Sequence, residues 1–381
     1  MHRIPQLRPK VGFVRCLRSA RSFTVLALES SADDTCASVV TSSREILSNV
    51  VVRQDDMHEM FGGIHPYIAI EAHQRNMPGA VRRALEDAKI KADDVDGIAY
   101  TRGPGMGGCL SVGSNAAKTL AAALNKPLVG VHHMQAHALT PMLTAPESDL
   151  PQFPFLTLLI SGGHTLLLLA TSLTSFRILA TTTDESVGRT FDKVSRKLDI
   201  PWSGMGPGAA LEKFCATDHP GIEIPYIDPP LPLAMLGELA FSYSGLHSAV
   251  DRYITSRKGI QNLDLPTKLG LARAFQAAAV SQLEEKLALG LKWCQHHTVP
   301  IRHVVVSGGV ASNTFLRERL KECLYQASPD VPVALLFPPP VLCTDNAAMI
   351  AWASMHRFLS GDYDDHSIEL RSKWSIEKLT D

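Results

Sequence analysis

The sequence predicts an α/β protein in which two related halves enclose a cleft. Two stretches read as strand, polar turn and strand: 23–42, "FTVLALESSADDTCASVVTS", and 153–172, "FPFLTLLISGGHTLLLLATS". A third stretch, 303–320, "HVVVSGGVASNTFLRERL", reads as a strand, a Ser-Gly-Gly turn and a helix capped near Ser312 or Asn313. Because "ISGGH" and "VSGGV" echo each other and strands alternate with helical segments, we expect two lobes whose turns point at one cleft.

The Pro-rich polar segment 141–152 is the best candidate for the boundary between the halves. We therefore expect an N-terminal lobe over 23–145 and a C-terminal lobe over 146–381. A second Pro-rich segment, 219–237, is expected to be a surface excursion.

Helical patterns lie between the predicted strands. The segment 72–90 is amphipathic but interrupted by Pro78, and 271–295 has a clear apolar stripe. A short helix is expected after the strand at 128–132, ended by Pro141. Near the C-terminus, a Pro run precedes a helix that is expected to start near Asp345.

The bulk composition is that of a globular chain with a sizeable core. Hydrophobic residues make up 45% and charged residues 20% of the 381 residues. Since no run of 18 apolar residues occurs, we expect no membrane insertion. The seven cysteines are scattered and form no C-x-x-C pair, which argues against a zinc–thiolate site and a disulfide framework and fits a reducing compartment.

Residues 1–22 differ from the rest of the chain. They hold six Arg and Lys and no acid, and the first carboxylate is Glu29. This composition predicts a mitochondrial targeting presequence, with a disordered basic tail as the alternative. Without those six, the chain carries 31 basic and 38 acidic residues, a net charge of −7. Such a balance argues against indiscriminate nucleic-acid binding, so any RNA contact has to use a local patch.

The polar turns after the predicted strands favour a nucleotide cleft. A Gly-Gly turn with a small hydroxyl lets backbone N–H groups approach an anion, and a following helix N-terminus adds its dipole. The turns "ISGGHT" and "VSGGVASN" have this form, and Asp33 and Asp34 stand on the acidic turn of the first hairpin. The alternative is that the Gly-Gly pairs only allow the chain to make a tight hairpin turn.

Gly103, Gly105 and Gly108 match the pattern G-x-G-x-x-G after a strand. A dinucleotide site needs an acid about 20 residues further on, and none occurs between Asp96 and Glu147. No Lys-Ser or Lys-Thr directly follows Gly113, where Ser114 stands, so the Walker A pattern also fails. We expect a close-approach turn with no dinucleotide role.

His133 and His137 stand four apart and would share one face of a helix. With 15 histidines in the chain, chance alone produces such a pair about as often as not. Asp345, at a probable helix start, could supply a third ligand, leaving open positions for phosphate oxygens or water. A zinc protease needs H-E-x-x-H with its general base, and here Met134 follows His133, so peptide hydrolysis is excluded.

Two further sets of residues are candidate binding residues, and each could instead be a solvated surface group. Asp192 could accept hydrogen bonds from ribose or an amine, or could be a solvated helix carboxylate. Arg75, Arg82 and Arg83 lie on one predicted helix and could grip RNA, or could form a solvated face.

Taken together, the motifs resemble one family, the universal tRNA threonylcarbamoyladenosine transferases (the TsaD-like proteins). The resemblance covers about residues 24–358, and with the basic leader it is closest to the mitochondrial members. It is carried, in order, by "ESSADDT", "YTRGPGMGG", "VHHMQAH", "ISGGHT", "FDKV", "GMGPG", "VSGGVASN" and "CTDNAAMIA".

The resemblance implies an actin-like, Hsp70-like ATPase (ASKHA) fold with the active site between two lobes. It implies transfer of a threonylcarbamoyl group from threonylcarbamoyl-AMP, made by a partner synthase, to N6 of the adenosine 3′ of the anticodon in tRNAs reading ANN codons. The metal ligands fall on His133, His137 and Asp345, for one divalent ion such as Fe, Zn or Mn. Substrate-binding positions fall on Ile160, Ser161, Gly162, Gly163, His164, Asp192, Gly206, Ser307, Gly308 and Asn313.

Asp33 or Asp34 is the candidate acceptor of the amine proton. The family commonly has Ser-Cys-Asp-Glu-Thr in the first turn, and Ala32 and Asp34 depart from it here. The stretch "GMGPG" departs from the commoner "GGP" around Gly206. Homodimerisation is implied by likeness to stand-alone mitochondrial members. The competing functions are an actin-fold small-molecule kinase and a nucleotide-sensing binding module.

Overall fold

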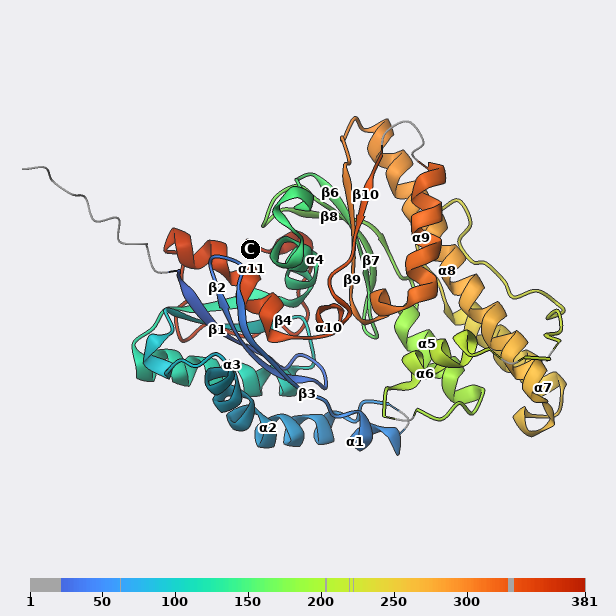
Figure 1. Cartoon of the computed structure of the whole chain (residues 1–381), viewed down its shortest axis with the longest axis horizontal. Coiled ribbons are helices and arrows are strands. Elements are labelled where there is room, and N and C mark those ends of the chain that lie inside the picture. The colour runs from blue at the N-terminus through green and yellow to red at the C-terminus, as the bar shows by residue number, and fades with distance from the viewer. Residues whose placement is uncertain are drawn as a thin grey trace, which may run out of the picture.

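The computed structural model describes residues 22–61, 63–202, 204–218, 220–221, 223–327 and 332–380. These residues form two five-stranded sheets with helices packed against them, which confirms the predicted α/β class (Figure 1). The predicted presequence, residues 1–22, lies outside the described residues except for Ser22.

The first sheet has the strand order β3-β2-β1-β4-β5. Strands β1 to β3 form an antiparallel meander, and β4 and β5 run parallel to β1. Every residue of β1 and β2 is buried, so both faces of these central strands are covered. The strands are β1 (Thr24–Glu29), β2 (Thr35–Thr41), β3 (Ile46–Val52), β4 (Gly97–Gly103) and β5 (Leu128–His132).

The second sheet repeats this topology with the order β8-β7-β6-β9-β10. Strands β6 to β8 are antiparallel, and β9 and β10 run parallel to β6. The hairpin β1–β2 thus corresponds to β6–β7, whereas the echoing turns "ISGGH" and "VSGGV" follow β6 and β9 and both lie in the second sheet, so their likeness does not mark the two halves. The strands are β6 (Phe155–Ile160), β7 (Thr165–Ala170), β8 (Phe176–Thr181), β9 (His303–Ser307) and β10 (Ala334–Leu336).

Helices cover both faces of the first sheet. On one face α2 (Pro66–Asp87) and α3 (Gly107–Leu124) bury an apolar cluster. On the other lie α4 (His133–Thr144) and α11 (Ala347–Ser360), which are packed against each other. Helix α11 thus belongs by packing to the first sheet, although it falls in the range predicted for the C-terminal lobe. The boundaries 23–145 and 146–381 stay predictions.

The remaining helices pack on and beside the second sheet, around the largest apolar cluster. Between α6 and α7, the described part of 219–237 forms no helix or strand, as predicted. These helices are α5 (Val187–Lys197), α6 (Pro207–Ala216), α7 (Ser244–Ser256), α8 (Leu265–His296) and α9 (Thr314–Ala327). The short elements are α1 (Asp55–Glu59), α10 (Pro340–Cys343), η1 (Ala92–Asp94), η2 (Glu147–Asp149), η3 (Ile260–Asn262), η4 (Gly309–Ser312) and η5 (Ile376–Lys378).

Two helices continue through prolines that were expected to interrupt or end them. Helix α2 runs through Pro78 and α4 runs through Pro141. A proline inside a helix costs about 3 kcal/mol. Packing offsets this cost, because α4 is buried along nearly its whole length and α2 packs against α3 and β2. Within the described residues, none of the helices has the length and apolar character needed to cross a membrane.

Candidate metal centre

Helix α4 carries both predicted histidine ligands, and its start is fixed by the residue before them. The Nδ1 atom of His132 accepts hydrogen bonds from the backbone N–H groups of Met134 (3.1 Å) and Gln135 (3.4 Å). The Nε2–H of His132 donates to the carbonyl of Trp374 (3.1 Å). Burial lowers the pKa of His132 to about 3, so the ring stays neutral and can cap the helix. His132 therefore caps the helix and is not directed at the metal centre.

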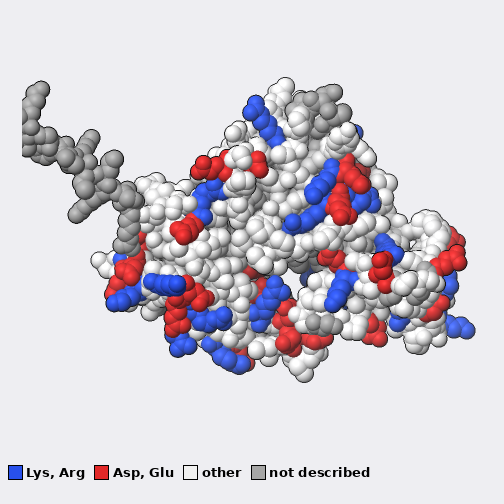
Figure 2. Space-filling model, in the orientation of Figure 1, with Lys and Arg blue, Asp and Glu red and all other residues white. Residues whose placement is uncertain are grey.

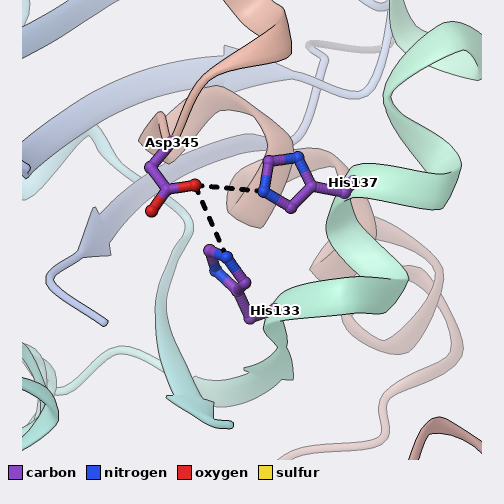
Figure 3. A group of neighbouring side chains, drawn as sticks. All are labelled: His133, His137 and Asp345. Atoms are coloured by element: carbon purple, nitrogen blue, oxygen red, sulfur yellow. Dashed lines mark hydrogen bonds and ion pairs between the residues drawn. The ribbon is translucent and has the colours of Figure 1, made fainter. Parts of the chain in front are cut away.

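His133 and His137 face the same point from one side of α4, and Asp345 reaches it from the segment before α11 (Figure 3). Oδ1 of Asp345 lies 3.1 Å from Nε2 of His137 and 3.5 Å from Nε2 of His133. Asn346 holds this segment, because its Oδ1 caps α11 at the N–H of Met349 (2.9 Å). The helix begins two residues after Asp345, so the carboxylate is presented by the loop.

The donor set fits a single divalent ion. One atom from each of His133, His137 and Asp345 lies within 4.8 Å of the others. Two imidazole nitrogens and one carboxylate oxygen suit Fe, Zn or Mn, with Mg less natural. Burial would raise the pKa of Asp345, but the imidazoles of His133 and His137 hold it well below its usual range. The ligand carboxylate is therefore charged at neutral pH, and the structure brings together the three predicted ligands.

Glu29 completes the centre, and sequence reasoning did not select it. At the end of β1, its Oε2 accepts from Nδ1 of His133 (3.1 Å), while its Oε1 accepts from the N–H of Ser31 (2.5 Å). Thr101 also donates to Glu29. Burial would raise the pKa of Glu29, but the charge of His133 lowers it. The available signal was a single carboxylate ending the otherwise apolar run "TVLALE".

Asp33 and Asp34 lie on the turn between β1 and β2 and line the space in front of the metal centre. Burial, reinforced by the charges of Asp345 and Asp55, raises the pKa of Asp33 to about 7. Burial and the charge of Asp33 raise the pKa of Asp34 well above its ordinary value. A carboxyl group that titrates near neutral pH can accept or release a proton under physiological conditions.

The Gly-rich loop before α3 packs directly against this acidic turn. A side-chain carbon at Gly105 would lie 2.7 Å from the carbonyl oxygen of Ser31, and one at Gly103 would lie 1.9 Å from that of Arg371. Only glycine permits such approaches. The loop 103–108 is thus the close-approach turn that the sequence predicts.

The turn Ile160–His164 joins β6 and β7, as predicted, and is closed by its own serine. The Ser161 hydroxyl accepts hydrogen bonds from the N–H groups of Gly163 (3.3 Å) and His164 (3.1 Å). Its backbone therefore has fewer free donors than the sequence pattern suggests. Gly162, Gly163 and the ring of His164 nevertheless face the cavity that the metal ligands line.

The turn after β9 lies against the first one. Gly308 has φ 98°, and a side-chain carbon there would meet the carbonyl oxygen of Ile160 at 2.4 Å. Asn313 caps α9 as predicted, because its Oδ1 accepts from the N–H of Leu316 (2.9 Å). The Ser307 hydroxyl is buried without a hydrogen-bond partner among the described residues.

Asp192 and Gly206 approach the same space from α5 and the start of α6. Oδ1 of Asp192 accepts from the N–H of Gly208 (3.0 Å), and burial raises the pKa of Asp192 to about 6. Gly206 is the N-cap residue of α6 and has φ 79°, where glycine is strongly favoured. Asp192 is therefore a cleft residue rather than a solvated helix carboxylate.

Two adjoining cavities, of about 550 and 840 Å³, lie between these elements. They share the walls Asp33, Asp34, Gly162, Asp192 and Arg196. Gly206 and Asn313 line the smaller cavity, and His133 and Asp345 line the larger. Volumes of this size suit small ligands, and together the cavities have room for two.

The predicted RNA-binding arginines Arg75, Arg82 and Arg83 lie exposed on α2 and line neither cavity. Arg82 lies 3.7 Å from Glu86. On the face shown in Figure 2, basic and acidic side chains alternate without an extended patch of one sign. The role of these arginines stays a prediction.

Comparisons with known proteins show the family of this chain. Residues 45–352 match the family model for tRNA N6-adenosine threonylcarbamoyltransferase. The mitochondrial tRNA N6-adenosine threonylcarbamoyltransferase of Schizosaccharomyces pombe is 39% identical, over 95% of this chain and 88% of the relative. A probable mitochondrial tRNA N6-adenosine threonylcarbamoyltransferase of Arabidopsis thaliana is 36% identical, over 93% and 75%. The tRNA N6-adenosine threonylcarbamoyltransferase of Rickettsia bellii is 37% identical, over 93% and 99%.

Among solved structures, full-length HypF in its phosphate- and nucleotide-bound form resembles this chain with a TM-score of 0.51. The two are 15% identical, and the match covers 90% of this chain and 56% of HypF. At this identity the likeness bears on the fold alone. With the repeated sheet topology, it confirms the predicted two-lobed actin-like ATPase (ASKHA) fold.

Proposed function

Because the chain belongs to the tRNA N6-adenosine threonylcarbamoyltransferase family, it is a transferase that modifies tRNA, and we propose how its cleft performs the transfer. The donor is threonylcarbamoyl-AMP, and the acceptor is N6 of the adenosine 3′ of the anticodon in mitochondrial tRNAs reading ANN codons. The compartment is the mitochondrion, in keeping with the names of the yeast and Arabidopsis relatives.

The observation that carries the proposal is the convergence of His133, His137 and Asp345 on a cavity that also meets the acidic and Gly-rich turns. A divalent ion held by these ligands would neutralise charge that develops on the departing AMP. Asp345 and the Nε2 atoms of the two histidines would hold the ion, and Glu29 would orient His133. The proposed ion is Fe, Zn or Mn.

The donor occupies the smaller cavity and the Gly-rich turns beside it. Gly206 and Asn313 line that cavity, and Asp192 stands on the wall between the two cavities. Asp192 suits the ribose hydroxyls of the adenylate as an acceptor. Gly162 and Gly163 after β6 and Gly309 after β9 line the cavities, and the lack of a Cβ lets their backbone approach the phosphate closely.

The target adenosine enters the larger cavity and attacks the carbamoyl carbon. A bond forms between N6 and that carbon, and the bond from carbon to the phosphate oxygen breaks, so that AMP leaves with the electron pair. The amine proton passes to Asp33, whose pKa of about 7 suits a group that accepts a proton near neutral pH. Asp34 has a pKa raised further and stands beside it as the second candidate. Holding both reactants in place contributes several kcal/mol of barrier reduction.

One partner follows from this chemistry, and the assembly is proposed from the likeness to stand-alone mitochondrial members. An activated carbamoyl adenylate has to be supplied by a synthase that makes it from threonine, bicarbonate and ATP. A homodimer is the proposed assembly.

A transfer assay tests the proposed function. Purified protein is incubated with labelled threonine, bicarbonate, ATP, the synthase and a tRNA reading an ANN codon. We expect label in the tRNA at the adenosine 3′ of the anticodon. A matched tRNA with guanosine at that position should stay unlabelled. Turnover of ATP by this chain alone, with no labelled tRNA, would contradict the proposal and favour a kinase or a nucleotide sensor.

A further inference from the structure

Exposed apolar side chains gather in one short segment beside the larger cavity. Five of the 13 large hydrophobic residues that are exposed in the described chain fall between residues 57 and 67. Contiguous exposed apolar surface of this kind marks an interaction site. They are Met57 (37% exposed), Met60 (82%), Phe61 (47%), Ile64 (44%) and Tyr67 (76%).

Three rings in this segment form a ladder that leads out of the cavity. The ring centroids of Phe61 and His65 are 4.8 Å apart, and those of His65 and Tyr67 are 6.2 Å apart. Phe61 and His65 line the larger cavity, which also contains the metal ligands His133 and Asp345. Tyr67 continues the ladder into solvent at the start of α2.

The buried His58 holds the ladder in place through hydrogen bonds. His58 is buried, its Nδ1 accepts from the N–H of His65 (3.3 Å), and its Nε2–H donates to Oε1 of Gln54 (3.2 Å). Burial lowers the pKa of His58, which keeps this arrangement neutral. His65 is therefore held by the buried His58, and the exposure of Phe61 and Tyr67 belongs to the folded chain.

Basic side chains stand across the cavity from the ladder. Figure 1 shows the segment from α1 to α2 facing α5 and α6. A side-chain carbon at Gly63 would lie only 3.8 Å from a guanidinium nitrogen of Arg196. Arg189 and Arg196, both on α5, line the larger cavity, and no described acid lies within ion-pair distance of either. The opening thus combines stacking faces on one side with the guanidinium groups of Arg189 and Arg196 on the other, and the charge of Arg196 also acts on Asp192.

This combination matches single-stranded RNA. Unpaired bases stack on aromatic faces, and the flanking phosphates contact basic side chains. A base inside a loop has to leave its stack before its exocyclic amine can reach a buried centre. A local site of this kind also agrees with a chain whose overall charge is close to zero.

We propose that the Phe61–His65–Tyr67 ladder is the stacking platform for unpaired bases of the tRNA anticodon loop. It receives the bases that flank the target adenosine while that adenosine enters the metal-side cavity, and Arg189 and Arg196 contact the neighbouring phosphates. This role rests on the proposed function, since it presupposes a tRNA substrate.

The test uses the full chain, a fluorescently labelled anticodon stem-loop RNA and anisotropy titrations at fixed salt. The variants Phe61→Ala and Tyr67→Ala remove one ring each, and Phe61→Tyr and Tyr67→Phe keep it. Tyr325→Ala is the matched control, because Tyr325 is 82% exposed and lines neither cavity. We expect each ring-removing variant to raise Kd about 5- to 100-fold. The ring-keeping variants and Tyr325→Ala should stay within about twofold of the unmodified chain.

The outcomes separate the platform from its alternatives. Unchanged Kd in both ring-removing variants would overturn the platform, while the unmodified chain could still label tRNA. Failure of the unmodified chain to label tRNA would overturn the proposed function and the platform with it. If sedimentation velocity shows that the ring-removing variants lose a dimer while RNA affinity stays unchanged, the segment is an interface with a second copy. Thermal unfolding at unchanged temperature confirms that each variant is folded.

Discussion

Nδ1 of His133 lies 3.1 Å from Oε2 of Glu29, although 104 positions separate the two residues in the sequence. The contact leaves Nε2 of His133 directed at Asp345, on the opposite edge of the ring. Carboxylates in this position fix the ring of a metal-binding histidine and raise its basicity. Glu29 is therefore a positioning residue for the metal centre.

Replacing this carboxylate tests its role. Glu29→Gln should lower metal affinity by about 10- to 100-fold, because the neutral amide weakens the hold on His133. Competition with a chromogenic chelator measures the affinity directly. The exposed Glu86→Gln is the control and should bind as the unmodified chain does. Equal affinity in Glu29→Gln would show that Glu29 serves only the packing of β1.

Removal of a single ligand should abolish stoichiometric metal binding. We expect His137→Ala and Asp345→Ala to retain well under one equivalent of metal after dialysis, as measured by plasma emission spectrometry. Both should lose transfer activity, and added metal should restore it only partly. His366→Ala removes an exposed imidazole far from the site and should keep the full equivalent. Full retention in either ligand variant would exclude the assigned set.

The pH profile of the transfer step should report Asp33. As a base it has to be ionised, and its pKa of about 7 lies above the ordinary value. Single-turnover rates with saturating donor should therefore rise from pH 5.5 and level off above pH 8. Asp33→Asn should lower the rate by at least about 100-fold and remove this rise. A normal rate in both Asp33→Asn and Asp34→Asn would refute proton transfer to this turn.

The same raised pKa has a stability consequence. The folded chain binds a proton at Asp33 more tightly than the unfolded chain, so its stability falls as pH rises through about 7. Asp33→Asn removes the buried charge and should raise Tm at pH 8 by a few degrees, with a smaller increase at pH 5, where only part of the destabilisation has developed. Calorimetry at the two pH values makes the comparison. A lower Tm at pH 8 would show that other contacts of Asp33 outweigh the burial of its charge.

Arg82 and Arg83 on α2 give a separate prediction for RNA binding. If both contact phosphates, Arg82→Glu combined with Arg83→Glu should weaken tRNA affinity and reduce the slope of log Kd against log salt by about 2. The same change at Arg252 and Arg257, on and just after α7, is the control. An unchanged slope in the α2 variant would mean that this face is only solvated.

Local sequence patterns were enough to predict much of the secondary structure and part of the metal site. Alternating apolar strands with Gly-Gly or acidic turns predicted the two hairpins, and the spacing of His133 and His137 placed both rings on one helix face. These features depend on residues a few positions apart, so the backbone geometry of strands and helices is enough to fix them. The shared layout of the segments 23–42 and 153–172 likewise predicted two related lobes, and the repeated strand order confirms it. The echo between "ISGGH" and "VSGGV" was a misleading signal, because both turns lie in the second sheet.

Only the tertiary structure decided which distant groups meet. Asp345 reaches His137 across 208 positions because α11 returns to the first sheet, and Glu29 reaches His133 because β1 and β5 flank β4. Local patterns also did not predict that α2 continues through Pro78, or that the rings at 61–67 form a ladder. In each case, long-range packing outweighs or redirects a local preference. Sequence motifs therefore indicated the chemistry, while the long-range packing of β1, α4 and α11 on the first sheet determined where its atoms stand.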